Sequence, residues 1–309
     1  MKKLASTAGL PHEEWLRLRR QGIGGSDAAA VCDLHPYRSA FQVYLDKTTE
    51  AEGEADNESM RQGRDLEEYV ARRFMEETGK KVRRANAVYY NEEHPCLLAD
   101  FDRLIIGERA GLECKTVNAY SADKWKDGNI PIHYQMQCQH YLAVSGFDCW
   151  YIAALIFGRE FVVRRIDRDE GLIRTLVSIE EHFWEENVQK RQAPPPDGTK
   201  EYTEELGKLY AQADREREVQ LAGFEERLAR REEIGALIEK LSKEKEQIDQ
   251  QIKCRMQSAT HAAAGGYRIS WGSVESSRVD TALLKAKFPE QYSQCLRKSS
   301  YRKFTVKAA

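Results

Sequence analysis

The sequence has no run of 18 apolar residues, so it offers no candidate for a membrane-spanning helix. Its N-terminus also lacks the apolar core of a secretory signal. The seven cysteines are odd in number and scattered, and no two of them form a Cys-x-x-Cys pair. This pattern disfavours a disulfide framework, a zinc site and an iron–sulfur cluster. We therefore expect a cytosolic protein with reduced thiols.

The formal net charge of −2 conceals an uneven distribution of charged residues. Residues 1–198 carry 27 Lys and Arg against 33 Asp and Glu, whereas residues 254–309 carry 10 against 3. An acidic body joined to a basic C-terminal segment suggests that this segment meets a polyanion or an acidic partner.

Length and proline content divide the chain into three parts. A run of three prolines at 194–196 ends the first part, because proline cannot continue a helix and stiffens a linker. We expect an α/β domain over 1–198, a charged helical segment over 199–256 and a small basic α+β module over 257–309. The helical segment is either one long helix or an antiparallel hairpin, packed on itself or on another subunit as a coiled coil.

In the last part, basic residues are interspersed with aromatic ones, a composition typical of surfaces that bind nucleic acid. The pattern fits a DNA-facing surface and a docking site for a partner protein equally well. These residues are Arg268, Arg278, Lys285, Lys287, Arg297, Lys298, Arg302 and Lys303, with Tyr267, Trp271, Tyr292 and Tyr301.

Hydrophobic periodicity and turn residues predict the secondary structure. The expected helices are 11–20, 28–32, 39–47, 60–78, 121–126, 132–144, 169–189 and 281–288. The expected strands are 81–90, 98–106, 112–116, 149–156, 159–166, 267–272 and 301–307.

The second and third of these strands form a hairpin that carries acidic and basic residues. Alternate side chains of a strand share a face, so Leu112 and Cys114 should point into the core, while Glu113 and Lys115 project from the other side. Asp102 lies on the neighbouring strand. The hairpin thereby places two carboxylates and one ammonium on one surface.

This combination suits the hydrolysis of a phosphodiester with Mg²⁺. Two carboxylates supply oxygen ligands for a hard cation. A nearby ammonium orients the attacking water and offsets the negative charge that develops at phosphorus. Strand alternation leaves Asp100 and Asp102 as competing ligands, because both lie on the same face. A solvated strand face with an ordinary Glu–Lys pair has the same pattern.

A glycine-rich turn, GIGGSD at 22–27, precedes the helix expected at 28–32. The free N–H groups of such a helix start bind phosphate well, although an ordinary N-cap has the same sequence. The preceding helix should turn Trp15 and Leu18 inward.

Two further helices carry polar residues next to apolar ones. Glu67 is either a surface residue or one turned toward a metal site, and Gln137 is either solvated or part of the site. Gln139 is interpreted as a surface residue. His133 and His140 are interpreted as structural or exposed, because Mg²⁺ prefers oxygen ligands to imidazole.

The motifs Trp-x-x-x-Arg, Gly-x-Gly-x-Ser-Asp and Asp-x(10)-Glu-x-Lys follow one another over residues 15–115. In this order they resemble the YqaJ-like viral recombinases, the lambda-exonuclease family of the PD-(D/E)xK nuclease superfamily. The resemblance implies an α/β core of the restriction-endonuclease type, in which helices flank a mixed central sheet and the active site lies on the central hairpin.

The resemblance also implies the roles of individual residues. It selects Asp102 over Asp100, and it leaves Arg17 and Arg20 as substitutes for Arg19 if the helix is rotated. The implied site comprises Asp102, Glu113, Glu67 and the Cys114 carbonyl on Mg²⁺, Lys115 and Gln137 around the attacking water, and Arg19 and Ser26 on the terminal 5′-phosphate of DNA.

The activity implied by the family is that of a Mg²⁺-dependent 5′→3′ exonuclease, with Mn²⁺ as a substitute metal. Such enzymes degrade one strand of linear double-stranded DNA and feed an annealing recombinase. The family further implies a toroidal trimer, encoded by a phage or prophage and acting in the cytoplasm of a bacterial host. One alternative is an endonuclease or repair nuclease on the same fold. Another is a non-catalytic protein that binds DNA ends or recruits a recombinase.

Overall fold

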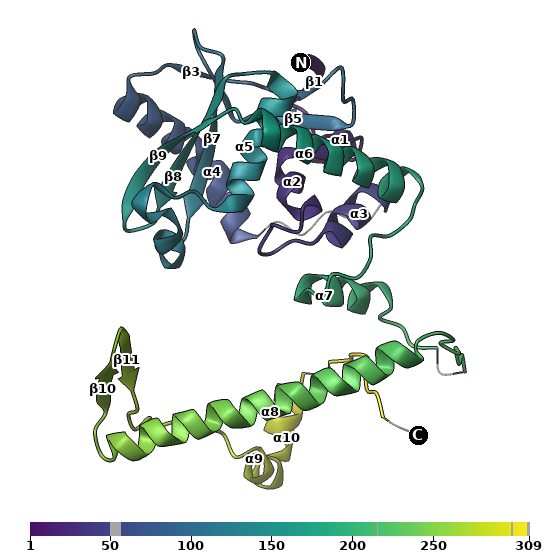
Figure 1. Ribbon diagram of the computed structural model, residues 1–309, viewed down its shortest axis with the longest axis vertical. Coiled ribbons are helices and arrows are strands. Elements are labelled where there is room, and N and C mark those ends of the chain that lie inside the picture. Colours follow the sequence, from purple (N-terminus) through teal and green to yellow (C-terminus); the bar gives the residue numbers. More distant parts are fainter. Residues whose placement is uncertain (50–56, 215, 298, 308–309) are drawn as a thin grey trace. The chain divides into compact units, whose positions relative to one another are not determined.

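The structure is a computed structural model that divides into two compact units, Met1–Tyr210 and Ala211–Ala309 (Figure 1). The residues that it describes are 1–49, 57–214, 216–297 and 299–307. Lys298 of the basic set above therefore lies outside the described residues. Within these ranges, no helix has both the length and the hydrophobicity needed to cross a bilayer.

The described residues of the first unit contain a central sheet of five strands, which are, in spatial order, β3 (Val82–Arg84), β6 (Arg103–Ile105), β7 (Ala110–Val117), β8 (Cys149–Ile156) and β9 (Glu160–Asp167). β7 pairs antiparallel with β6 and parallel with β8, and β8 pairs antiparallel with β9. The expected mixed sheet is confirmed.

A second sheet takes up the other short strands of this unit, which are, in spatial order, β1 (Lys2–Ser6), β4 (Ala87–Tyr90), β5 (Leu97–Asp100) and β2 (Ile23–Gly24). The chain therefore changes sheets between β3 and β4 and again between β5 and β6. The continuous strands predicted over 81–90 and 98–106 are wrong in this respect. At the first change, Asn86 adopts a φ of +49°, which no strand residue has.

The helix α4 (Glu58–Thr78) covers one face of the central sheet. Val70 and Phe74 of its apolar stripe pack in one cluster with Leu112 of β7. Gly79 ends the helix in the left-handed conformation at a φ of +70°, as a C-terminal glycine commonly does. The predicted helix and its stop are confirmed.

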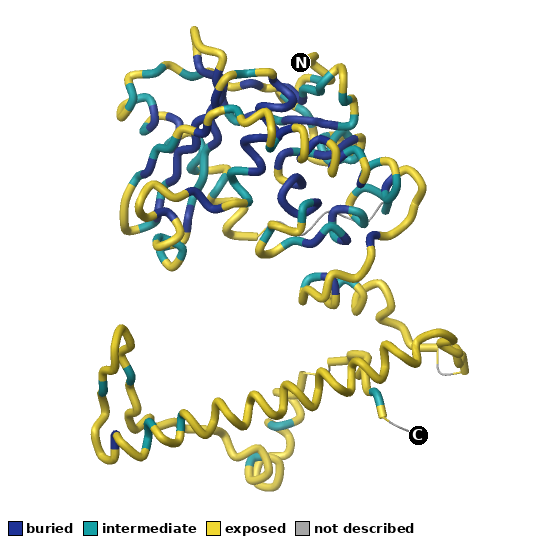
Figure 2. The backbone as a smooth tube through the Cα atoms, viewed as in Figure 1, coloured by how far each residue is buried: buried dark blue, intermediate teal, exposed yellow. Residues whose placement is uncertain are grey.

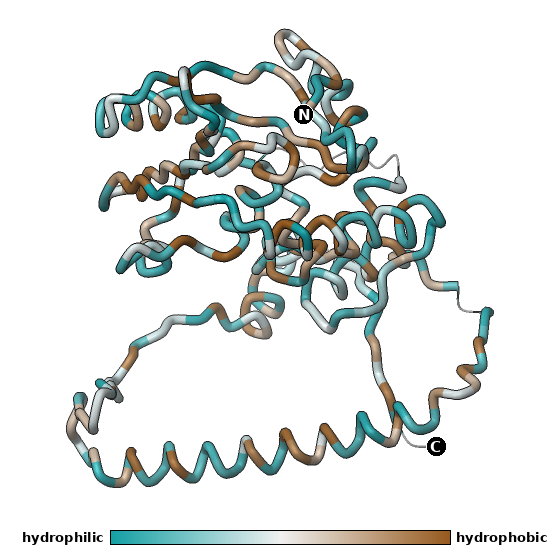
Figure 3. Tube along the Cα trace, turned by 45° about the horizontal axis from the view of Figure 1, so that its top comes forward, coloured by the Kyte–Doolittle hydropathy of each residue, from teal (hydrophilic) through white to brown (hydrophobic). Residues whose placement is uncertain are grey.

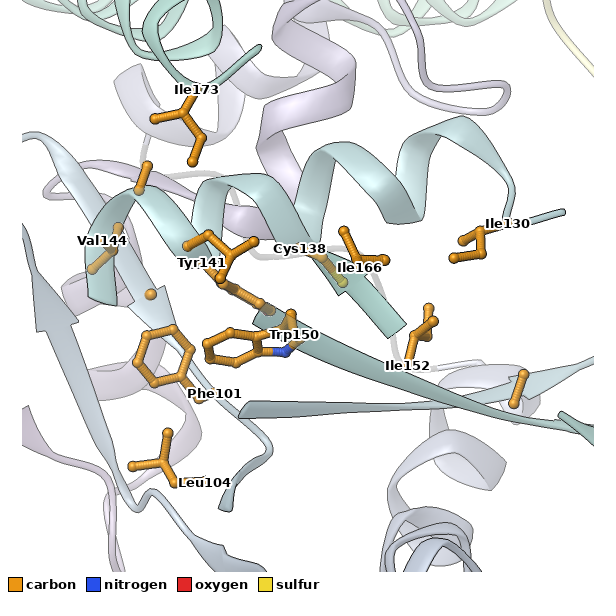
Figure 4. Packing of buried hydrophobic residues seen from close by; sticks show 14 of the residues in the cluster. Phe101, Leu104, Ile130, Cys138, Tyr141, Val144, Trp150, Ile152, Ile166 and Ile173 are labelled. Carbon is orange, nitrogen blue, oxygen red and sulfur yellow. The ribbon is translucent and has the colours of Figure 1, made fainter. Parts of the chain in front are cut away.

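The opposite face of the sheet is covered by α5 (Ile132–Ser145), against which α6 (Glu170–His182) packs. Trp150 and Phe101 pack beneath α5, with ring centroids 4.8 Å apart (Figure 4). Both faces of β7 are therefore covered. The sequence analysis expected a core on the Leu112 side only, so Glu113 is more buried than anticipated.

Two polar residues of α5 are buried. Gln139 was expected at the surface, but its Nε2 donates to the carbonyl of Asp167 at 2.8 Å. His140 is fully buried, with Nδ1 at 2.8 Å from a Glu180 carboxylate oxygen and Nε2 at 2.8 Å from the Leu98 carbonyl. The surface interpretation of Gln139 was wrong, and of the two alternatives for His140 the structural one is confirmed, because α5 is enclosed on several sides by α6, α2 and the sheets.

The N-terminal part contributes α1 (His12–Arg19), α2 (Gly25–Val31) and α3 (Ala40–Thr48). A Cβ atom on Gly25 would lie 2.4 Å from the Tyr141 ring, so only glycine allows α2 to approach α5 this closely. The first turn of α2 is thereby held against the helix that carries Gln137.

The remaining helices of this unit are η1 (Ala119–Gly128), η2 (Phe183–Gln189) and α7 (Lys200–Leu209). Tyr202 of α7 stacks on Phe41 at 4.2 Å between centroids, and its hydroxyl donates to the Pro194 carbonyl at 3.2 Å. The first unit therefore continues past the prolines to Tyr210, and α7 does not join the charged helix that follows.

The second unit consists of α8 (Glu225–Met256), β10 (His261–Ala264), β11 (Tyr267–Ser270), α9 (Thr281–Lys287) and α10 (Pro289–Cys295). β10 and β11 pair only with each other among the described strands. The strand predicted over 301–307 is wrong, because these residues have no strand partner and no regular structure.

α8 is a single helix of 32 residues, so residues 225–256 do not fold back on themselves as a hairpin. Figure 3 shows apolar positions recurring along it, and Figure 2 shows it exposed over most of its length. Leu237 and Leu241, for example, are 50% and 61% exposed. A coiled coil of this helix stays a prediction.

Candidate active site

The central hairpin brings three of the predicted site residues together. Glu113 is 3% exposed, and its Oε1 accepts a hydrogen bond from Lys115 Nζ at 2.6 Å. Asp102 lies in the short connection between β5 and β6. Its Oδ2 accepts from the backbone N–H of Cys114 at 2.7 Å, which ties the aspartate to the strand that carries Glu113.

The electrostatic environment of these groups separates their roles. Burial, followed by the charges of Glu113 and Glu67, raises the pKa of Asp102 well above its usual value. Burial lowers the pKa of Lys115, but the charge and hydrogen bond of Glu113, together with Tyr134 and Asp102, outweigh it and the net pKa is raised. Lys115 is therefore a permanent cation at neutral pH, suited to orienting groups and not to removing a proton.

Gln137 is buried against the carboxylate and is not solvated. Its Nε2 donates to Glu113 Oε1 at 2.7 Å and lies 2.8 Å from the Tyr141 hydroxyl. That hydroxyl in turn donates to the backbone carbonyl of Asp100 at 3.4 Å. The amide thus fixes one oxygen of Glu113, and Tyr141 fixes the amide.

The structure separates the two aspartates that strand alternation could not. Asp102 lies with Glu113, whereas the Asp100 carboxylate accepts a hydrogen bond from Trp15 Nε1 at 2.7 Å. Asp100 is the last residue of β5 in the second sheet, whereas Asp102 lies in the connection to β6 of the central sheet. The alternation of side chains along one strand therefore does not apply to this pair. Asp100 holds α1 in place and is not grouped with Glu113.

The fit of this site to a divalent cation depends on the second oxygen of Glu113. Within the described residues, Glu113 Oε2 is buried and has no hydrogen-bond partner. A buried carboxylate oxygen without a partner is costly, and a hard cation would satisfy it. The raised pKa of Asp102 points the same way, since a cation would relieve the repulsion between the two carboxylates. Asp102 and Glu113 therefore fit a Mg²⁺ site.

The charge of Glu67 acts on Asp102, but the Glu67 carboxylate is bound to an arginine. Its carboxylate accepts a hydrogen bond from Arg103, whose guanidinium also donates to the Asp102 carbonyl at 2.8 Å and to Glu68 at 3.1 Å. Across the described ranges, no three His, Cys, Asp or Glu side chains are arranged as a metal cluster. The metal role of Glu67 stays a prediction that requires its release from Arg103.

The two residues expected on the DNA end are in contact. Arg19 Nη2 donates to Ser26 Oγ at 2.6 Å, and the Arg19 guanidinium lies over the Trp15 ring at 4.9 Å. Ser26 is exposed in the first turn of α2. Because Trp15 is bonded to Asp100, hydrogen bonds and ring contacts connect this pair to the Glu113 site through Tyr141 and Gln137.

A buried carboxylate organises the cations around Ser26. Asp27 is fully buried, accepts from Lys47 Nζ and Arg38 Nη1 at 2.7 Å each, and lies 3.6 Å from Arg19. Burial raises the pKa of Asp27, but these three cations outweigh it and hold the pKa well below its usual value. Lys47 also donates to the Arg19 carbonyl at 2.8 Å.

The sequence analysis did not identify Tyr141, Arg103, Arg38 or Lys47 as parts of the site. Tyr141 had a usable signal, because it lies four residues after Gln137 and so shares a helix face with it. The other three had none, since their partners are distant in sequence.

Comparisons with known proteins agree with this architecture. The family model described as "YqaJ-like viral recombinase domain" matches residues 14–148. The "Uncharacterized protein YqaJ" of Bacillus subtilis (strain 168) is 38% identical over 308 residues, which cover 98% of this chain and 97% of that protein.

Solved structures of similar fold include an alkaline exonuclease, LHK-Exo, from Laribacter hongkongensis. It matches with a TM-score of 0.51 and 20% identity, over 63% of this chain and 97% of that chain. The structure of LHK-Exo in complex with dAMP matches with the same TM-score and 21% identity, over 63% of this chain and 99% of that chain.

Proposed function

The chain belongs to the family of YqaJ-like viral recombinase domains, and on this basis we propose that it is a Mg²⁺-dependent 5′→3′ exonuclease of linear double-stranded DNA. The observation that carries the proposal is the grouping of Asp102, Glu113 and Lys115, in which one carboxylate oxygen of Glu113 has no hydrogen-bond partner within the described residues. An exonuclease of similar fold has been solved with dAMP, which supports DNA as the substrate class.

Asp102, Glu113 and the Cys114 carbonyl are the proposed holders of Mg²⁺, with Mn²⁺ as a substitute and Glu67 as an additional ligand once Arg103 releases it. The bound metal would supply a water of lowered pKa and neutralise charge at phosphorus. Lys115 presents a positive charge to the water and the phosphate oxygens. Gln137 keeps Glu113 Oε1 in place, which would leave the other oxygen free to hold the metal.

Arg19 and Ser26 are the proposed contacts of the terminal 5′-phosphate. A guanidinium and a hydroxyl already 2.6 Å apart can both donate to the same phosphate oxygens. Asp27 favours this role indirectly, because it holds Arg38 and Lys47 in place and keeps Arg19 near α2.

The proposed biological setting is phage recombination in the cytoplasm of a bacterial host. The single strand that the enzyme exposes would pass to an annealing recombinase, and a trimer would enclose the DNA. The basic residues of the second unit would contact either DNA or this partner protein, and α8 would pair as a coiled coil.

The test is the degradation of end-labelled linear duplex DNA in Mg²⁺, comparing 5′-phosphate with 5′-hydroxyl ends. Wild type should release label from phosphorylated ends, and Lys115→Ala should lower the rate by about 10²–10³. Lys190→Ala is the control, because Lys190 is exposed and pairs with Glu186 on η2.

Two results would contradict the proposal. Cleavage of closed circular DNA would indicate an endonuclease or repair nuclease on the same fold. DNA binding without any Mg²⁺-dependent cleavage would indicate a non-catalytic end-binding or recombinase-recruiting protein. The burial of Glu113 beside Lys115 argues against a non-catalytic protein, because burying charged groups costs free energy and a protein that only binds DNA does not need them there.

A further inference from the structure

Four aromatic side chains form a continuous surface beside the candidate active site. His35 and Tyr37 come from the loop between α2 and α3, and His133 and Tyr134 from the first turn of α5. The ring centroids are 6.3 Å apart for His35 and Tyr37, 5.2 Å for His35 and His133, and 4.0 Å for His133 and Tyr134. We name these four residues the aromatic platform.

The platform adjoins the residues that carry the proposed chemistry. Lys115 Nζ lies 5.0 Å from the centre of the Tyr134 ring while it is paired with Glu113. At the other end, His35 and Tyr37 belong to the loop that carries Arg38, which is bound to Asp27. Burial, followed by the charges of Arg38 and Lys115, lowers the pKa of His35. The platform therefore connects the neighbourhood of Lys115 with the cations around Asp27.

The platform is accessible, although it contains large rings. Tyr37 is 65% exposed, and His35, His133 and Tyr134 are half-buried. Lys124 Nζ lies over the Tyr37 ring, 5.8 Å from its centre, and adds a second cation beside the platform. This lysine and Lys115 give the surroundings of the rings a positive character.

The two imidazoles of the platform have lowered pKa values. Burial, followed by the charges of His35 and Lys115, lowers the pKa of His133 to about 4. Flat rings with ammonium groups close to them match a nucleic-acid strand, whose bases are flat and whose backbone is anionic. Aromatic side chains stack on any base, so such a surface does not depend on sequence.

Resting on the nuclease function proposed above, we propose that the aromatic platform stacks on unpaired bases of the strand being degraded, next to the phosphodiester at Lys115. Glu113 is buried and the Lys115 side chain is only 21% exposed, so a single strand can approach them more closely than the wider duplex. Stacking on the platform replaces the stacking that the separated bases lose.

The test is a binding measurement on the full chain without divalent metal, so that it does not depend on catalysis. The two probes are 5′-phosphorylated duplexes with a two-nucleotide 5′ overhang of either thymidines or abasic tetrahydrofuran residues. Both carry the same phosphates and differ only in bases. Fluorescence anisotropy should give the thymidine probe an affinity about tenfold higher for the wild type.

Tyr37→Ala should bring the ratio of the two affinities close to one, mainly by lowering the affinity for the thymidine probe. Tyr37→Phe keeps the ring and should keep the ratio. Tyr37 is exposed, so neither change should disturb folding. A ratio near one in the wild type, or an unchanged ratio in Tyr37→Ala, would overturn the proposal.

These outcomes are separable from those of the nuclease assay. Cleavage by the wild type together with an affinity ratio near one would contradict base stacking by the platform and would still support the exonuclease. A tenfold ratio without cleavage would support base stacking by the platform in a protein that is not a nuclease.

Discussion

In Met1–Tyr210 the large apolar side chains are mostly buried between helices and sheets, whereas in Ala211–Ala309 most of them are exposed. Leu142 of α5 is fully buried, and Leu241 of α8 is 61% exposed. Burial of apolar surface is the main source of stability in a folded domain. The difference indicates that the first unit supplies its own stability, while α8 presents an apolar surface that the described residues of its own unit do not cover.

The units also differ in how they use charge. The first unit buries charged groups in pairs, including Glu113 with Lys115 and His140 with Glu180. The ion pairs of the second unit, such as Lys245 with Asp249, are exposed. Buried pairs are sensitive to the loss of one partner, and exposed pairs are not. Mutations that remove one partner of an ion pair therefore test this difference between the two units.

The largest effect is expected for Glu180→Ala. It would leave the buried imidazolium of His140 without its carboxylate and should lower the free energy of unfolding by about 3–5 kcal/mol. The matched control is Glu181→Ala on the same helix, whose partner His94 is partly exposed, and it should cost about 1 kcal/mol or less. Denaturant midpoints measure both. Equal losses would mean that burial does not distinguish the two pairs.

The comparison of leucines comes next. Leu142→Ala removes fully buried side-chain atoms and should lower the free energy of unfolding by about 2–5 kcal/mol. Leu241→Ser should change it by about 0.5 kcal/mol or less, because the side chain is exposed on α8. Chemical denaturation of the full chain measures both. A large fall in the free energy of unfolding for Leu241→Ser would contradict this difference between the units. It would indicate that α8 is covered in the assembled protein, as in a coiled coil.

A smaller effect is expected from pH. Burial lowers the pKa of His140, but the Glu180 carboxylate and the Leu98 carbonyl outweigh it, with a contribution from Asp27, and the pKa is raised above 6.5. The stabilisation is therefore complete below 6.5 and is lost as pH rises through the folded pKa. Glu180, whose pKa burial raises above 4.5, acts in the same direction.

The free energy of unfolding should accordingly fall as pH rises above 6.5. Denaturation at several pH values measures the slope, and His140→Gln serves as the control in which the slope above 6.5 should flatten. A stability that rises over this range in the wild type would contradict the assignment of a charged His140.

The smallest effect is expected for Tyr141→Phe. It removes the hydroxyl between Gln137 and the Asp100 carbonyl but leaves the bond from Gln137 to Glu113. The loss of the two hydrogen bonds of this hydroxyl should lower kcat about fivefold and leave KM unchanged. Tyr44→Phe removes a comparable bond, to the Arg191 carbonyl, away from the site and should not alter kcat. An unchanged kcat in Tyr141→Phe would show that Gln137 needs no support.

Predictions from the local sequence were confirmed where the structure depends on residues that are close together in the chain. The helix that ends at Gly79, the hairpin of β8 and β9 and the pairing of Glu113 with Lys115 all follow from periodicity over a few residues. The alternation within β7 held because the strand runs unbroken from Ala110 to Val117.

The same reasoning failed where the chain changes sheets. Asp100 and Asp102 were expected on one face, yet one holds Trp15 and the other Cys114. His140 was undecided because nothing near it in sequence indicates that Glu180, forty residues later, lies within hydrogen-bonding distance.

The sequence by itself determined which residues are proposed to carry the chemistry, since the order and spacing of the Trp15, Ser26, Asp102 and Glu113 motifs are visible without a fold. Only the tertiary structure decided which aspartate lies with Glu113 and that Arg103 binds the Glu67 carboxylate. It alone also brought the four residues of the aromatic platform together beside Lys115. The physical reason is that these contacts join segments far apart in the chain, and packing, not local propensity, brings such segments together.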